Sequence, residues 1–192
     1  MSLLSIQQIE KAIEERHIVV LPFARSFVRP STIILRLGSE LVRFRPGIEP
    51  IDPYNQKSIE GNALEKESFQ KTIIPPASFV LASTLESVSV AQHLVGIISN
   101  LSHLARLGLS VHHGSFLVHA GFGQISPSSL TLEIYNHNPA PLILYAGMPI
   151  CHLGFLRMEN LFGDSYDEQV GIYSGQQEPQ LSLYYKEFFK EQ

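Results

Sequence analysis

The sequence predicts a mainly β protein, folded as a sandwich, a jelly roll or a distorted barrel, with one N-terminal helix and one short central helix. Apolar segments of strand length recur between Thr32 and Phe155, and Gly or Pro interrupts them at short intervals. Helix signals are confined to the N-terminus and a short stretch near residue 102. The 192 residues, 44% of them hydrophobic, suit one core, so we expect a single domain over residues 1–192.

The first expected element is a helix near the N-terminus. Residues 5–8, Ser-Ile-Gln-Gln, form a capping box, in which the first and last side chains satisfy each other's backbone N–H groups. Ile6, Ile9 and Ile13 then share one helical face. The helix should end before the apolar run at 18–23.

Short strands separated by turns are expected next. They cover residues 32–37, 41–44, 78–83, 87–90, 95–98, 117–122, 130–135, 142–145 and 150–155. Residues 46–72 are rich in Pro, Asn, Gln and charged side chains, which predicts a long surface excursion. The tail over residues 160–192 is polar and contains several tyrosines, and we expect it to be mobile.

Composition and charge limit the kinds of partner. A net charge of −4 with a pI near 6.0 argues against a general binder of nucleic acid or of membrane surfaces. The one cysteine, Cys151, excludes an internal disulfide and fits a reducing compartment. No signal-peptide pattern opens the sequence, and no apolar run approaches the roughly 20 residues of a membrane span. We therefore expect a cytoplasmic protein.

One carboxylate stands inside an apolar strand. Within residues 130–135, Leu-Thr-Leu-Glu-Ile-Tyr, the side chains of Thr131, Glu133 and Tyr135 share one face. A glutamate in that position could line a cleft and act as a general base. The alternative is a solvent-facing or salt-bridged glutamate on a two-sided strand, which the pattern alone favours.

Residues 102–108, Ser-His-Leu-Ala-Arg-Leu-Gly, predict a short helix that begins near Ser102 and ends at Gly108. Free N–H groups at its start could bind an anion, and Arg106 offers a planar fork of donors. Simple capping with a surface arginine is the alternative, and it needs no ligand.

Eight histidines raise the question of a metal site. His112 and His113 are adjacent, so on a strand they point to opposite faces, and the other histidines lack the close spacing of metal ligands. A zinc-dependent cytidine deaminase needs an H-x-E motif followed by P-C-x-x-C, which one cysteine cannot supply. We expect no protein-bound metal, and this also disfavours a cupin-type sugar- or metal-binding module.

Six segments, in order along most of the chain, resemble the dCTP deaminases of the trimeric dUTPase superfamily. They are Pro30–Gly38 (PSTIILRLG), Leu81–Val88 (LASTLESV), Leu94–Gly96 (LVG), Leu104–His112 (LARLGLSVH), Leu132–Asn136 (LEIYN) and Ala146–Ile150 (AGMPI). Each match alone is weak, and together they are specific. The resemblance implies a dUTPase-like fold of the β-clip type and a homotrimer whose active sites are shared between subunits.

The resemblance also implies a reaction, the conversion of dCTP to dUTP and ammonia without zinc, with Mg²⁺ held mainly by the triphosphate. In that reaction Glu133 is the general base, while Ser102 and Arg106 hold the catalytic water and bind substrate. The hairpin over residues 111–122 encloses the pyrimidine and the deoxyribose, and the tail closes over the phosphates. The further substrate-binding residues implied in the hairpin and the tail are His112, Val118, His119, Tyr166, Tyr173 and Gln176.

The chain departs from the family pattern at positions implied to meet the substrate. Leu101 replaces an arginine before the short helix, and Ile172 replaces a lysine in the tail. His119 replaces an aspartate in the hairpin, which argues against hydrolysis of dUTP. Two lost charge-assisted hydrogen bonds, at roughly 1.5–3 kcal/mol each, would weaken triphosphate binding by about two to four orders of magnitude.

Three compensations are open: a hydrogen bond from His103 or His119, a tail lysine at position 186 or 190, or a substrate with fewer phosphates. The alternative to an active deaminase of a deoxycytidine nucleotide is a catalytically inactive paralogue that binds a nucleotide or has a structural role.

Overall fold

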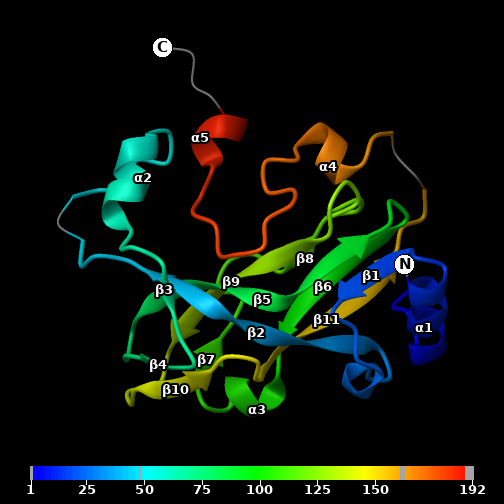
Figure 1. The fold of residues 1–192 in the computed structure, drawn as a ribbon, viewed down its shortest axis with the longest axis horizontal. Coiled ribbons are helices and arrows are strands. Elements are labelled where there is room, and N and C mark those ends of the chain that lie inside the picture. Colours follow the sequence, from blue (N-terminus) through cyan, green and yellow to red (C-terminus); the bar gives the residue numbers. More distant parts are fainter. Residues whose placement is uncertain (1, 48, 161–162, 189–192) are drawn as a thin grey trace.

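Strands dominate the structure, a computed structural model that describes residues 2–47, 49–160 and 163–188 (Figure 1). The strands are β1 (Ile18–Leu21), β2 (Thr32–Arg43), β3 (Glu67–Ser68), β4 (Lys71–Ile74), β5 (Phe79–Val90), β6 (Leu94–Asn100), β7 (Leu109–Ser110), β8 (Leu117–Val118), β9 (Ser128–Asn136), β10 (Leu142–Tyr145) and β11 (Pro149–Arg157). The helices are α1 (Ile6–Glu14), the 3₁₀ turn η1 (Arg25–Phe27), α2 (Gln56–Asn62), α3 (Ser102–Ala105), α4 (Tyr166–Gln169) and α5 (Tyr184–Glu187). Within the described ranges, no helix has the length and apolar character needed to cross a membrane.

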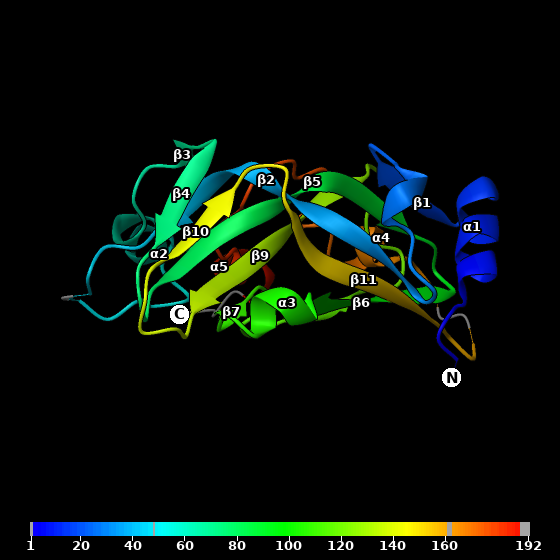
Figure 2. The ribbon, with the colours of Figure 1, turned by 90° about the horizontal axis from the view of Figure 1, so that it is seen from below.

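Nine strands form one antiparallel sheet in the order β7-β9-β5-β2-β11-β6-β8, with β1 added beside β5 and β3 beside β2. Figure 2 shows this sheet curled, with β2, β5, β9 and β11 running obliquely through it. β4 and β10 form a separate two-stranded ribbon. The prediction of a mainly β fold of the distorted barrel or jelly-roll type is confirmed.

The N-terminal helix follows its sequence signals. The Gln8 side chain accepts a hydrogen bond from the Ser5 N–H at 2.8 Å, which completes the capping box. Ile9 and Ala12 are buried on the face that packs against the sheet. The helix ends at Glu14, before β1, as the sequence predicts.

Alternating side chains explain how β9 fits the sheet. Leu130, Leu132 and Ile134 are buried in the core, whereas Thr131 and Glu133 stay partly exposed on the opposite face. β9 pairs with β5 on one edge and with β7 on the other, so its position is set by both neighbours. The polar face predicted for this strand therefore points away from the apolar core.

Two pairs of predicted strands are single long strands. The predicted segments 32–37 and 41–44 join in β2, and the next two segments join in β5. Gly38 does not end β2, because it lies where a Cβ would come within 3.0 Å of Ser83 and so permits a close approach of β5. The register of β2 against β5 shifts at this point, as in a β-bulge.

The excursion over residues 46–72 contains more regular structure than its composition predicts. Asn55 caps α2 by accepting a hydrogen bond from the Ser58 N–H at 3.2 Å, and Ile59 of this helix is buried. β3 pairs with β2, and β4 pairs with β10. Because both pairings join residues far apart in the sequence, local patterns do not predict them.

A buried ion pair joins β2 and β5 just beyond the pairing of Leu37 with Thr84 at the end of their ladder. The carboxylate of Glu86, which is 2% exposed, accepts from the backbone N–H of Arg36 at 2.7 Å and from its Nε at 2.6 Å. The guanidinium also lies over the Phe27 ring, 5.1 Å from its centroid. Burial, and then the charge of Glu86, raise the pKa of the nearby Cys151 thiol. Burying a carboxylate is costly unless it is paired with a cation and hydrogen-bonded, and Glu86 meets both conditions.

We expect Arg36→Met to destabilise the fold by about 3 kcal/mol, because it leaves the Glu86 carboxylate buried without its partner charge. Urea unfolding at pH 7 measures this loss. Arg25→Met is the matched control, since Arg25 pairs with Glu10 at the surface, where ion pairs contribute little. Equal effects of the two substitutions would contradict a central role for the buried pair.

Candidate active site

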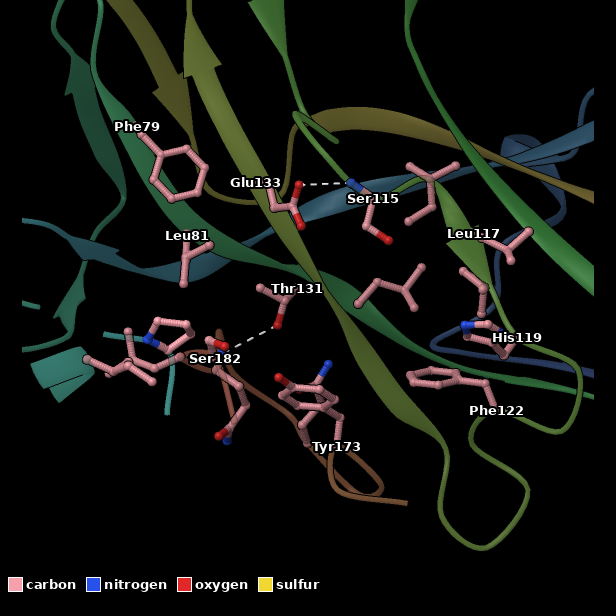
Figure 3. Close-up of a pocket in the computed structure, with 18 of the residues that line it drawn as sticks. Phe79, Leu81, Ser115, Leu117, His119, Phe122, Thr131, Glu133, Tyr173 and Ser182 are labelled. Carbon is pink, nitrogen blue, oxygen red and sulfur yellow. Dashed lines mark hydrogen bonds between the residues drawn. The ribbon is translucent and has the colours of Figure 1, made fainter. Parts of the chain in front are cut away.

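A cavity of about 570 Å³ lies between the polar face of β9, the hairpin that follows β7, the excursion and the tail (Figure 3). This volume falls within the range of small-ligand sites. Several residues predicted for the site line it: Val118, His119, Glu133, Tyr166, Tyr173 and Gln176. The cavity therefore brings together predicted site residues from the hairpin, β9 and the tail.

Glu133 enters the cavity from β9 and stands between Phe79 and Ser115 (Figure 3). Its Oε2 accepts hydrogen bonds from the backbone N–H of Gly114 at 2.6 Å and of Ser115 at 3.0 Å. The backbone also joins strand and hairpin, since the Glu133 N–H donates to the Val111 carbonyl at 3.1 Å. Both side-chain bonds use Oε2, so among the described residues Oε1 has no donor and is available to a water molecule.

A stacked pair of rings forms the opposite end of the cavity. The His119 ring lies parallel to the Tyr166 ring, with centroids 5.1 Å apart and an interplanar angle of 3°. Phe122 packs beside them, 6.1 Å from Tyr166 between centroids. Burial raises the pKa of the Tyr166 hydroxyl, and the charge of Glu187 raises it further. These contacts join the hairpin to the first helix of the tail.

The tail crosses the cavity and is bonded to β9. The Gln176 Nε2 donates to the Ser129 carbonyl at 2.7 Å, and the Ser129 N–H donates to the Gln176 carbonyl at 2.8 Å. The Gln176 Oε1 is buried and has no hydrogen-bond partner in the described part of the chain. The Tyr173 hydroxyl accepts from the Leu183 N–H at 2.9 Å. The tail described here is thus packed against the cavity; its predicted mobility stays a prediction.

Asp167 is the anchor of the tail that sequence reasoning missed. Its buried carboxylate accepts from the Gly123 N–H at 3.1 Å, the Ile125 N–H at 3.0 Å and the Ser174 hydroxyl at 3.1 Å. A local signal was present, because residues 165–168, Ser-Tyr-Asp-Glu, form the capping box that begins α4. The bonds to the loop after Phe122, however, exist only in the folded chain.

A family model for dCTP deaminase-like proteins matches residues 3–158. The chain belongs to the dCTP deaminase-like family. The sequence is 34% identical over 179 residues to a dCTP deaminase, dUMP-forming, from Methanospirillum hungatei, covering 93% of this chain and 94% of that protein. It is 35% identical to the protein of the same description from Methanoculleus marisnigri, covering 93% of each. The resemblance stated from the sequence motifs is confirmed.

The fold is also similar to the crystal structure of 2′-deoxycytidine 5′-triphosphate deaminase from Agrobacterium tumefaciens. The TM-score is 0.61 at 17% identity, and the match covers 80% of this chain. It covers 47% of that chain, so the present sequence spans about half of that longer protein. At this identity the likeness supports the dUTPase-like fold and nothing beyond it.

Three residues that the family resemblance implicates lie outside the lining of the cavity within the described part of this chain. Ser102 and Arg106 are exposed, at the start of α3 and directly after it. Figure 1 shows α3 below the sheet and the tail helices α4 and α5 above it. His112 forms an isolated bridge with Glu133 and does not line the cavity. Within a single chain, neither Ser102 nor Arg106 therefore lies in the cavity with Glu133.

The compensating groups considered from the sequence differ in position: His119 lines the cavity, whereas His103 and Lys186 lie outside its described lining. His103 is exposed on α3, and the Lys186 Nζ lies over the Tyr185 ring, 5.9 Å from its centroid. Lys190 lies outside the described residues. Among the side chains that the structure describes, no three of His, Cys, Asp or Glu gather where they could hold a metal ion.

The excursion supplies a wall of the cavity that the sequence analysis did not anticipate. Ile51, Pro53 and Ile59 line the cavity from this segment, beside Phe44. The excursion also contacts the tail, through Lys66, which pairs with Glu178 and with Glu40 of β2. The rings of Tyr54 and Tyr184 meet edge to face with centroids 5.2 Å apart. Figure 1 shows α2 and α5 on the same side of the sheet.

We expect Asp167→Asn to loosen the tail, because the amide replaces one of the acceptor oxygens that hold two backbone N–H groups. Losing one charged hydrogen bond should raise the opened population roughly tenfold. Chymotryptic cleavage after Tyr173, followed by mass spectrometry, measures that population. Asp164→Asn, at an exposed position in the same segment, is the control. Equal cleavage rates in the two variants would show that Asp167 does not anchor the tail.

Proposed function

We propose that this chain catalyses the hydrolytic deamination of the cytosine ring of a deoxycytidine nucleotide, with dCTP as the first substrate to test. One observation carries the proposal: Glu133, the single carboxylate among the described residues that line the cavity, stands on the strand that the family motif identifies. The names of the two archaeal relatives support dCTP as a substrate. The predicted single domain, its cytoplasmic location and the absence of nucleic-acid and membrane partners stay predictions.

In the proposed reaction Glu133 is the general base. Its free Oε1 takes a proton from a water molecule, whose oxygen bonds to C4 of the cytosine ring. Glu133 passes this proton to ring N3 and then relays the second proton of the water, from the hydroxyl now on C4, to the amino group, so that the C4–N bond breaks and ammonia leaves. The two backbone N–H groups of Gly114 and Ser115 hold Oε2 and so orient the carboxylate. The apolar wall formed by Phe79 and Leu117 would exclude other water.

We propose that a second copy of the chain completes the site. Ser102 and Arg106 are exposed and lie away from Glu133 in their own chain, which fits a role toward a neighbouring subunit. A homotrimer with shared active sites, as the resemblance implies, would satisfy this geometry. Arg106 would then orient the water, and Ser102 would hydrogen-bond to it.

The proposal treats zinc and Mg²⁺ differently. No zinc is needed, because the carboxylate activates the water directly. Mg²⁺ would accompany a triphosphate, since it prefers phosphate oxygens and water as ligands. The one carboxylate of the described lining, Glu133, already accepts two backbone hydrogen bonds. The residues of the cavity therefore do not form a Mg²⁺ site of their own, and no step of the reaction is assigned to the ion.

The second candidate is a paralogue that keeps the fold and binds a nucleotide without turnover. Leu101 and Ile172 favour it, because they stand where the resemblance implies phosphate-binding cations. A separate point concerns the product if the chain is active. His119 replaces the aspartate of the family pattern, which argues against further hydrolysis of dUTP, so dUTP rather than dUMP is the product expected from dCTP. Ammonia release from any deoxycytidine nucleotide would exclude the paralogue that binds a nucleotide without turnover.

We expect Glu133→Gln to lower kcat by about 10²–10⁴ and to leave ligand affinity nearly unchanged, because the amide cannot accept the water proton. Ammonia release and chromatography of the nucleotide products measure turnover, and calorimetry measures binding. Glu14→Gln, exposed on α1, is the control. Unchanged turnover in Glu133→Gln would remove Glu133 from the chemistry.

We expect Glu133→Gln and Arg106→Ala subunits, each inactive alone, to regain activity when they are expressed together. Random mixing would give about a quarter of the sites one intact Glu133 and one intact Arg106 from different chains. Light scattering on a sizing column measures the assembly in the same samples. A monomer, or a trimer without recovered activity, would contradict sharing of the site between subunits.

A further inference from the structure

The segment that holds the Glu133 carboxylate has little regular structure of its own. The strands that flank residues 111–116, β7 and β8, are only 2 residues long each. Glu133 Oε2 nevertheless accepts hydrogen bonds from two consecutive N–H groups of this segment, those of Gly114 at 2.6 Å and Ser115 at 3.0 Å (Figure 3). Hydrogen bonds are directional, so the segment orients the carboxylate only while other contacts hold the segment itself in place.

His113 joins this segment to β9 in two ways. Its backbone N–H donates to the Glu133 carbonyl at 3.1 Å. Its ring stacks on the Tyr135 ring, with centroids 4.9 Å apart and an interplanar angle of 24°. Tyr135 lies two residues after Glu133 on the same strand, and so their side chains share one face. The ring that stacks therefore belongs to the residue immediately before the two N–H groups that bind the carboxylate.

Tyr135 is a well-held partner for this stack. Its backbone pairs with β5 on one side and with β7 on the other. The ring of His137, which follows β9, also meets the Tyr135 ring, with centroids 4.5 Å apart. Among the described side chains of residues 112–116, His113 is the one whose ring stacks on an aromatic ring of β9. Removing the His113 ring would therefore leave the segment without this anchor on the strand.

The residue after His113 has no side chain, and this lets the backbone approach the carboxylate. A Cβ added at Gly114 would lie 3.2 Å from the Glu133 Oε2, which is closer than ordinary van der Waals contact. A side chain at this position would push the carboxylate away or displace the segment. His113 and Gly114 thus have complementary effects: the first fixes the segment on β9, and the second admits the carboxylate.

We propose that His113 is a positioning residue, which acts through its stack on Tyr135 to hold the two N–H groups that orient the Glu133 carboxylate. Its effect on turnover rests on the proposed deamination, whereas its effect on the hairpin rests on contacts within the chain alone.

Proton transfer is the step that depends on this positioning. A general base accelerates a reaction only while its oxygen is held within hydrogen-bond reach of the water that it activates. When the segment loosens, the carboxylate spends less time in that geometry, although the surfaces that bind the base and the sugar are unchanged. Loss of the stack should therefore slow the chemical step more than it weakens substrate binding.

Steady-state kinetics of the purified full chain with dCTP and Mg²⁺ separate positioning from binding. We expect His113→Ala to lower kcat about threefold to tenfold and to leave KM within about twofold, because one ring contact is lost. His113→Phe keeps a stacking ring and should restore kcat to within about twofold of the unsubstituted chain.

His137→Ala is the matched control. His137 is also an exposed histidine, and its ring lies 4.5 Å from that of Tyr135 and 5.8 Å from that of His113 between centroids. It follows β9 and is not part of the hairpin, so kcat should change less than about twofold. An unchanged kcat in His113→Ala, an equal loss in His137→Ala, or no recovery in His113→Phe would overturn the inference. A rise in KM at constant kcat would also overturn it, because His113 would then act in binding.

Amide hydrogen exchange tests the cause without any turnover. Mass spectrometry of fragments that contain Gly114 and Ser115 measures how often their N–H groups leave the carboxylate. We expect His113→Ala to raise the exchange rate about threefold to tenfold, and His137→Ala to leave it within about twofold. If the chain deaminates no deoxycytidine nucleotide, the proposed function fails, and the exchange rates still decide whether His113 holds the hairpin. Equal rates in His113→Ala and the unsubstituted chain would overturn the inference.

A substitution at Gly114 tests the close approach of the segment to the carboxylate. We expect Gly114→Ala to lower kcat about tenfold, because the added Cβ displaces Glu133 Oε2 and small misplacements of reacting groups are costly. Gly61→Ala in α2 is the matched control, since a Cβ at Gly61 meets nothing within 4 Å. Equal kcat values for the two variants would show that contact with the segment does not position the carboxylate, and would overturn the inference.

Discussion

The pairing of Glu86 with Arg36 is the interaction on which the geometry of the cavity depends. β2 and β5 approach closely at Gly38, and the register of their pairing shifts there. The Glu86 carboxylate accepts from both the backbone and the side chain of Arg36 close to this interruption, so the two long strands stay joined. β9 pairs with the other edge of β5, and the register of β5 therefore decides where Glu133 stands.

From that strand outward, the cavity is assembled by hydrogen bonds between distant segments. Backbone N–H groups of Gly114 and Ser115 hold the Glu133 carboxylate, and Asp167 holds the loop that follows the hairpin. Gln176 then bonds to β9 beside it. Each of these bonds joins a short polar side chain to backbone groups, which fixes position more tightly than apolar contact alone.

The fold of the chain agrees with the family, whereas the charged residues of its described cavity differ from the family's sequence pattern. The curled sheet, the Glu133 strand and the hairpin agree with membership of the dCTP deaminase-like family. The described wall of the cavity, however, carries one anion and no lysine or arginine. Conservation of the fold follows from the apolar core, whereas affinity for phosphate follows from a few surface cations that can change without cost to that core.

The sequence by itself determined the mainly β fold, the α1 capping box, the alternation that turns Glu133 away from the core, and the family. These features depend on residues that are close along the chain, or on short sequence motifs that can be recognised without a structure. Only the tertiary structure decided that β2 and β5 run through Gly38, that the excursion contains α2 and lines the cavity, and that Asp167 anchors the tail. It also decided that Ser102 and Arg106 lie apart from Glu133 within one chain. Local patterns record which backbone conformations are favourable, and they carry no information about which distant segments supply the remaining hydrogen-bond partners.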